Sequence, residues 1–257
     1  MAGVGSVLVR PEMPWDVHAT KLAVALTDYE KYIRTDELLG LQKAADELSC
    51  HDELQFQVVH QAHELYMKLI EHELRFACKL LENREVARAV TTLARVAKVQ
   101  RVLMSSVDLL DTMAPTDYMT IRAGLGRGSG QESPGFRMML RLPGEVVWPA
   151  MARFLETEGV TLRQIYEAPH DRHLLFQLCE GLLDYDQLLQ AWRYRHLLLV
   201  YRIIGTGTPS LKGKHSDLLL HGMKQRFFPK IWDVRDEVFG EWTAAQEARG
   251  RDPGYHG

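Results

Sequence analysis

The sequence predicts an all-α fold, and three observations support this. Apolar residues recur at alternating spacings of three and four along most of the 257-residue chain, which is the period of one helical face. Runs of alternating apolar and polar residues, which would indicate strands, are lacking, and no segment repeats. We therefore expect one helical domain, a bundle, over residues 28–257. A loose arm over residues 1–27 is expected to precede it.

The helical pattern begins at Asp28 and becomes strong in the segment that follows. A long helix is predicted over about 50–82, with Ser49 as its N-cap and Asp52 in the position of a capping-box acid. Its inward stripe consists of Phe56, His60, His63, Met67, Ile70 and Leu74. A second long helix is expected over about 85–112, ended by Pro115, and a short helix is expected over 117–125.

The segment GLGRGSGQESPG, residues 124–135, holds five glycines and is predicted to be a loop. Its backbone must bend sharply or approach another element closely. No strand precedes it and no GK[ST] closes it, which argues against nucleotide binding. Ser133 and Pro134 are expected to cap and start the next helix. Beyond it we expect one or two shorter helices over 143–170, a long helix over 173–204 that stops at Gly205, and a final helix holding Leu218 to Phe228.

The composition is that of a globular protein, with 46% hydrophobic and 25% charged residues. Its 31 basic and 34 acidic residues give a net charge of −3, which argues against a nucleic-acid binder that relies on bulk positive charge. No run of 18 uncharged apolar residues is present, so we expect no membrane span. Three scattered cysteines without a CxxC pair and an N-terminus unlike a signal peptide predict a reducing, cytoplasmic location.

Two histidines on apolar helical stripes, His60 and His196, are the first candidates for chemistry. Each can be a core histidine bonded to a carbonyl or an acid, or an axial ligand that holds heme iron inside a bundle. His63 lies three residues after His60, so both could bind a metal with help from Glu64, although the pattern is not HExxH. Arg122 can grip a substrate carboxylate or form a surface salt bridge.

Three segments together resemble the tryptophan 2,3-dioxygenase family, a group of all-helical, homotetrameric heme enzymes. They are HDELQFQVVHQAHEL, DTMAPTDYMTIRAGLGRGSGQES and QAWRYRHLLLVYRIIG, and the likeness runs from about Asp28 to Val234. The resemblance implies heme b as cofactor, an aromatic amino acid and O2 as substrates, and a homotetramer. In the family, both oxygen atoms enter across the C2–C3 bond of the indole and give N-formylkynurenine.

The resemblance also implies which residues hold the cofactor. His196 matches the proximal iron ligand, and His60 matches the distal histidine that faces the indole N–H. Ser129, Gly130 and Trp192 are expected beside the heme and its distal pocket.

On the substrate side, the resemblance places Phe56 against the indole and Arg122 on the carboxylate, with Tyr118 and Leu125 in the pocket. The ammonium contact is expected from a hydroxyl of the loop after the last long helix, at Ser210 by gapless counting, with Thr206 and Thr208 as alternatives. The residues expected to reach into a neighbouring subunit's active site are Tyr29, Tyr32 and Ile33.

The chain departs from the family near the substrate. It has SGQES where SGFQS is usual, which puts Gln131 in place of a phenylalanine, and Val107 stands where bacterial members often have tryptophan. The stretch from about 143 to 180 is shorter than usual. These departures leave open a monooxygenase that forms a hydroxylated or oxindole product from a substituted tryptophan or a tyrosine. A non-enzymatic heme sensor and a purely structural helical oligomer are further alternatives.

Overall fold

The expected all-α fold is confirmed by the computed structural model, which describes residues 26–126, 128, 130–206 and 224–250. Within those ranges the regular structure is entirely helical. The elements are α1 (Asp28–Ile33), α2 (Thr35–Leu39), α3 (Glu53–Glu82), α4 (Val86–Leu110), α5 (Pro115–Gly124), η1 (Gly130–Glu132), α6 (Pro134–Leu142), η2 (Pro143–Val147), α7 (Trp148–Glu158), α8 (Leu162–Glu167), α9 (His173–Ile204) and α11 (Pro229–Ala248).

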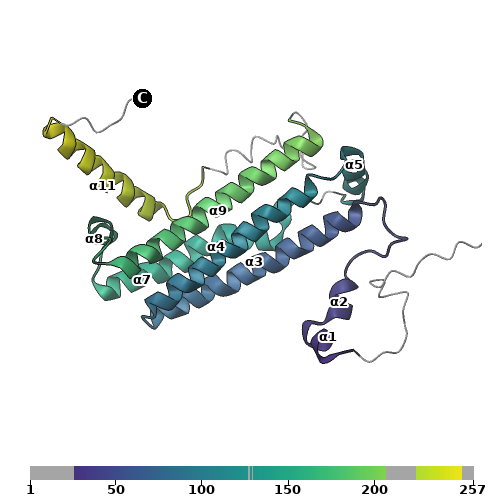
Figure 1. Ribbon diagram of the computed structural model, residues 1–257, viewed down its shortest axis with the longest axis horizontal. Coiled ribbons are helices and arrows are strands. Elements are labelled where there is room, and N and C mark those ends of the chain that lie inside the picture. Colours follow the sequence, from purple (N-terminus) through teal and green to yellow (C-terminus); the bar gives the residue numbers. More distant parts are fainter. Residues whose placement is uncertain (1–25, 127, 129, 207–223, 251–257) are drawn as a thin grey trace, which may run out of the picture.

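Three long helices, α3, α4 and α9, lie side by side and form the body of the molecule (Figure 1). α4 is the central one, because it packs against both α3 and α9. α6, η2 and α7 cover α3, and α5 lies at one end of the bundle. α1 and α2 stand apart from the bundle beyond an extended connection, and α11 leaves it at the opposite end (Figure 1).

The core consists of two clusters of buried apolar side chains. The larger lies between α3, α4, α7 and α9 and includes Ile70, Leu93 and Leu182. The smaller gathers at the end where α5 lies, around Val59, Val107, Leu110, Met113, Ile121 and Leu199. Trp192 packs against both clusters. The apolar residues predicted at spacings of three and four therefore face the core. The two clusters meet beside Trp192.

Most predicted helix boundaries are confirmed to within a few residues, and that of α9 is confirmed at both ends. Ser133 caps α6 as expected, since its Oγ accepts a hydrogen bond from the Phe136 N–H at 2.9 Å. Gly205 follows α9 with φ 79°, and its N–H donates to the Tyr201 carbonyl at 3.0 Å. Pro115 occupies the first turn of α5, where a missing N–H costs nothing.

The predicted N-cap at Ser49 is wrong. α3 begins at Glu53 after Asp52, and neither Ser49 nor Asp52 caps it with a side chain. The Ser49 N–H and Oγ instead donate to the Glu53 carboxylate, at 2.6 and 2.7 Å. Lys43 Nζ lies 2.5 Å from the same carboxylate. These bonds, first that of Lys43, lower the pKa of Glu53 to about 2, so the buried acid anchors the preceding connection.

The predicted final helix is also wrong where it can be checked. Residues 218–223 lie outside the described residues, residues 224–228 are not helical, and α11 begins at Pro229. Asp186 explains this break, because its Oδ2 accepts hydrogen bonds from the Phe227 N–H at 3.0 Å and from Trp232 Nε1 at 2.9 Å. Phe228 beside it is fully buried. The chain is thus fixed to α9 just before α11 starts.

No helix in the described ranges is both long enough and apolar enough to cross a membrane.

Candidate functional site

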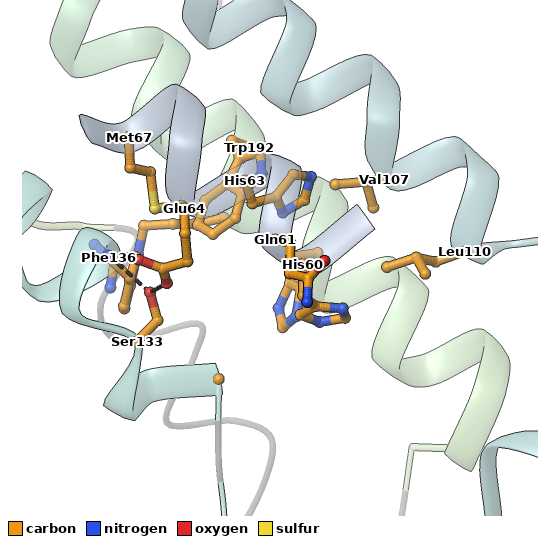
Figure 2. A pocket seen from close by; sticks show the side chains of 13 residues that line it. His60, Gln61, His63, Glu64, Met67, Val107, Leu110, Ser133, Phe136 and Trp192 are labelled. Atoms are coloured by element: carbon orange, nitrogen blue, oxygen red, sulfur yellow. Dashed lines mark hydrogen bonds between the residues drawn. The ribbon is translucent and has the colours of Figure 1, made fainter. Parts of the chain in front are cut away.

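A cavity of about 250 Å³ lies where α3, α4, α6 and α9 meet (Figure 2). Its lining residues are His60, Gln61, His63, Glu64, Met67, Val107, Leu110, Gly130, Ser133, Phe136, Trp192, Arg193 and His196. The walls are mostly apolar, with three imidazoles among them. Two histidines predicted from separate helices, His60 and His196, therefore border one cavity.

His60 is held by its own helix with one ring nitrogen available. Its Nδ1 lies 2.7 Å from the Phe56 carbonyl oxygen, which can only accept, so Nδ1 carries the proton and donates. Burial lowers the pKa of His60, against the smaller raising effects of that carbonyl and of Glu64. A neutral ring in this tautomer has an unprotonated Nε2 that can accept a hydrogen bond. The Phe56 ring lies beside it, with centroids 4.0 Å apart.

His196 lies on α9, one turn after Trp192, and the two rings stack at 5.9 Å with an interplanar angle of 23°. Burial, with a smaller effect of His60, lowers the pKa of His196 to about 4, so the ring is neutral at pH 7. No hydrogen bond joins it to another residue in the part of the chain that the structure describes. A neutral imidazole with an available nitrogen is what an axial iron ligand requires.

His63 is a third imidazole of the cavity, and it is largely buried. The Ser106 hydroxyl donates to the Leu103 carbonyl at 2.9 Å, so it accepts from His63 Nε2 at 2.7 Å. Burial, then the neighbouring His60 and His196, lowers the pKa of His63 to about 4. Among the described residues no group of three or more His, Cys, Asp or Glu is placed to hold a metal ion. This argues against the metal site of His60, His63 and Glu64 that the spacing allowed.

Glu64 fixes the wall that α6 forms. Its carboxylate accepts a hydrogen bond from the Ser133 hydroxyl (Figure 2) and another, at 3.0 Å, from the Gly135 N–H. A Cβ on Gly135 would lie 2.8 Å from Glu64 Oε2 and 2.8 Å from Met67 Cβ. The close backbone approach expected of the glycine-rich segment is thus confirmed at Gly135, and the sharp bend is confirmed at Gly126, with φ 59°.

The sequence reasoning missed several lining residues, chiefly Met67, Phe136 and Arg193 as parts of one cavity. Phe136 packs on Trp192 with centroids 5.6 Å apart, although the two residues belong to different helices. The sequence could have identified Arg193, because it lies within the segment WRYRH and directly follows Trp192, which was predicted to lie beside the heme.

The residues present fit a heme. His196 offers an uncharged nitrogen, the walls are mostly apolar, as the porphyrin ring is, and His60 presents an acceptor from another helix. The Trp192 Nε1 is buried and has no hydrogen-bond partner among the described residues. A ligand bound in the cavity that carries an acceptor at this wall would satisfy that donor. Two cofactor-side predictions, Gly130 and Trp192, line this cavity, whereas Ser129 lies outside the described residues.

The residues expected to bind substrate lie beside the cavity or apart from it. Tyr118 and Arg122 are on α5, partly buried, and Leu125 follows α5 with 38% of its surface exposed. None of these three lines the cavity. Tyr118 packs against the smaller core cluster, and burial raises its pKa.

The residues predicted from α1 do not line the cavity of this chain, and of those predicted from the loop after α9 only Thr206 is described. Tyr29 and Tyr32 are 70% and 88% exposed, and Ile33 is 39% exposed, on a helix that stands apart from the bundle (Figure 1). Thr206 is exposed just after α9, while Thr208 and Ser210 lie outside the described residues.

Comparison with known proteins gives one consistent family. A family model described as Tryptophan 2,3-dioxygenase matches residues 16–146. The chain is 32% identical to the tryptophan 2,3-dioxygenase of Caulobacter vibrioides, over 82% of this chain and 98% of that protein. It is 31% identical to that of Bacillus thuringiensis subsp. konkukian, over 82% of this chain and 92% of that protein. With the enzyme of the same name from Herpetosiphon aurantiacus the identity is 28%, over 84% of this chain and all of that protein.

Proposed function

This chain belongs to the tryptophan 2,3-dioxygenase family, and on that premise we propose that it binds heme b and uses O2 to open the indole ring of L-tryptophan. It is accordingly an oxidoreductase. The observation that carries the proposal is the meeting of His60 and His196 at one largely apolar cavity. Heme, when bound, supplies the iron that activates O2, and His196 is the residue that would hold that iron.

His60 is proposed to orient the indole. Its Nε2 carries a lone pair because Nδ1 donates to the Phe56 carbonyl, so it can accept the indole N–H without being charged. Phe56 lies against the imidazole and offers an aromatic surface next to it. A fixed acceptor and an aromatic wall together restrict the ring to one orientation, which is the main contribution that a protein makes to such a reaction.

Arg122 is proposed to bind the substrate carboxylate from α5, which packs against both α3 and α9. A guanidinium fork matches a carboxylate in two hydrogen bonds. Tyr118 and Leu125 would complete this side of the pocket, and a hydroxyl at Thr206, Thr208 or Ser210 would take the ammonium. The exposed residues Tyr29, Tyr32 and Ile33 would enter the pocket of a neighbouring subunit, so we propose a homotetramer.

A second outcome, insertion of a single oxygen atom, is kept because of one feature of the cavity. Val107 lines it, at the position where bacterial relatives often carry a large tryptophan. A smaller side chain gives a substituted indole, or a phenol, room to bind in another orientation.

The test is incubation of the reduced, heme-loaded protein with tryptophan, methylated tryptophans and tyrosine under 18O2, read by mass spectrometry. We expect a product from tryptophan that carries two labelled atoms of one O2 molecule. One labelled atom would identify the monooxygenase outcome. Absence of product from every substrate, with a heme spectrum that tryptophan does not alter, would contradict an enzyme and favour a heme sensor.

A further inference from the structure

His63 is an imidazole of the cavity to which the proposed function assigns no role. It lies on α3 one turn after His60, with the two ring centroids 6.2 Å apart, and both rings line the cavity (Figure 2). The Ser106 hydroxyl donates to the Leu103 carbonyl and so accepts from His63 Nε2 at 2.7 Å. Burial lowers the pKa of His63 to about 4, so the ring is neutral at pH 7.

The Nδ1 of His63 is therefore a hydrogen-bond acceptor without a partner. A neutral imidazole carries one ring proton, which His63 uses at Nε2, so Nδ1 has an available lone pair. No hydrogen bond joins that nitrogen to another residue in the described part of the chain. A buried acceptor left without a hydrogen bond costs about 1–3 kcal/mol, so a ligand that brings a donor to this nitrogen is bound more tightly than one that does not.

Other acceptors on the cavity wall are already used within the chain. Gln61 accepts from Gln42 Nε2 at 2.5 Å. The two oxygens of Glu64 accept from residues at the start of α6. His60 differs from these, because its Nδ1 is bonded and its Nε2 is not. Along α3 the cavity thus has two unpaired acceptor nitrogens among the described residues, one on His60 and one on His63.

We propose that His63 binds a ring hydroxyl of the substrate, so that the pocket favours a hydroxylated tryptophan over tryptophan itself. The inference rests on the proposed function, in which His60 accepts the indole N–H. The ring system of tryptophan has that single donor, whereas a hydroxytryptophan has two, one for each acceptor on α3. The substrate ammonium suits His63 less well, because it is attached to the same carbon as the carboxylate that Arg122 of α5 is proposed to bind.

The wall beside His63 is compatible with such a substituent. Ser106, which bonds to His63, directly precedes Val107 on α4, and Val107 lines the cavity (Figure 2). The valine side chain has no polar atom, so it does not compete for the lone pair of His63 Nδ1. Its short side chain also extends less far into the cavity than a larger apolar residue would. A hydroxyl at this wall therefore has the His63 imidazole as its partner.

The experiment compares tryptophans hydroxylated at each carbon of the benzene ring with methyltryptophans substituted at the same carbon. A methyl group is close to a hydroxyl in size but has no donor, so the ratio of the two Kd values isolates the hydrogen bond. Each Kd is measured by titration of the spectrum of heme-loaded wild type, His63→Phe, His63→Gln and His72→Phe. His72 is the matched control, because it is an exposed histidine of α3 that does not line the cavity.

For at least one ring position, we expect the wild type to bind the hydroxytryptophan about 5- to 100-fold more tightly than its methyl counterpart. His63→Phe should reduce that ratio to near one, and His72→Phe should keep it. His63→Gln retains an oxygen acceptor and should keep part of the ratio, which guards against a variant that folds poorly. An unchanged ratio in His63→Phe would overturn the inference. Equal weakening of both ligands in His63→Phe would also overturn it, since that indicates a structural role.

Three further outcomes separate this inference from the proposed function. If tryptophan gives the doubly labelled product but the wild type prefers no hydroxytryptophan, the proposed function stands and the role of His63 is refuted. If neither tryptophan nor any hydroxytryptophan alters the heme spectrum, the proposed function fails and the inference fails with it. If tyrosine, which has a ring hydroxyl but no indole N–H, binds as tightly as the best hydroxytryptophan, the two acceptors do not act together, which overturns the inference.

Discussion

Replacement of Gly135 by alanine tests how α6 is seated against α3. The added methyl would lie 2.8 Å from Met67 Cβ and 2.8 Å from Glu64 Oε2. The glutamate can rotate, but Met67 Cβ is attached directly to the backbone of α3, so the two helices must separate. Overpacking of this kind costs about 1–3 kcal/mol, and alanine in place of glycine in a helix returns about 0.5–1 kcal/mol. We expect a net loss of about 1–2 kcal/mol of unfolding free energy.

The assay is urea unfolding of wild type and variant, with thermal unfolding as a second measurement. For a chain of this size the loss corresponds to a fall in Tm of about 2–8 °C. Gly240→Ala is the matched control, because Gly240 lies inside α11 and a methyl group added there would have nothing within 4 Å. That variant should be unchanged or more stable by up to about 1 kcal/mol. If Gly135→Ala behaves like the control, the close seating of α6 is refuted.

Four more predictions address the site and its support. His196→Ala should be purified without heme absorbance, whereas His60→Ala should keep heme and lose product formation; a normal heme spectrum in the first variant would contradict the ligand assignment. Arg122→Leu should weaken tryptophan binding by about 2–5 kcal/mol, measured by titration of the heme spectrum, and an unchanged Kd would rule out its role. Asp186→Ala leaves the Phe227 N–H before α11 and the Trp232 Nε1–H within α11 unpaired and should cost about 2–4 kcal/mol in urea unfolding; a loss below about 0.5 kcal/mol, the level of a surface change, would be inconsistent with that anchor. The pKa of His63 is about 4 in the folded chain and higher in the unfolded chain, so acid favours unfolding. The unfolding free energy of the cofactor-free wild type should therefore fall between pH 6.5 and 4, and at pH 5 the unfolding free energy of His63→Gln should have fallen by about 2 kcal/mol less. Parallel curves of unfolding free energy against pH would contradict this.

The fold was predictable where a helix buries one face. α9 keeps its apolar stripe over 32 residues, so both of its ends could be predicted. α11 was missed because Ile231 is its only fully buried residue among those described, which leaves little pattern to detect. Ser49 looked like a cap, but its hydroxyl is used by the carboxylate of Glu53, a tertiary arrangement that no local rule contains.

The candidate site was predictable in part for the same reason. His60 and His196 lie on long stripes, so each could be placed on the inner face of its helix. That they share one cavity could not be derived from periodicity, because it depends on how α3 and α9 pack through α4. The pairing of Glu64 with Ser133, 69 residues later, is likewise a product of the tertiary fold.

The position of Trp192 between the two core clusters has a consequence for cooperativity. Both clusters contact its indole, and the cavity opens beside it. A rigid ligand bound there would contact both clusters, so the smaller cluster at the α5 end and the larger cluster would unfold in one cooperative transition. Hydrogen exchange should then show the amides of α5 gaining protection along with those of α9 when the ligand binds, although residues of α9 line the cavity and those of α5 do not.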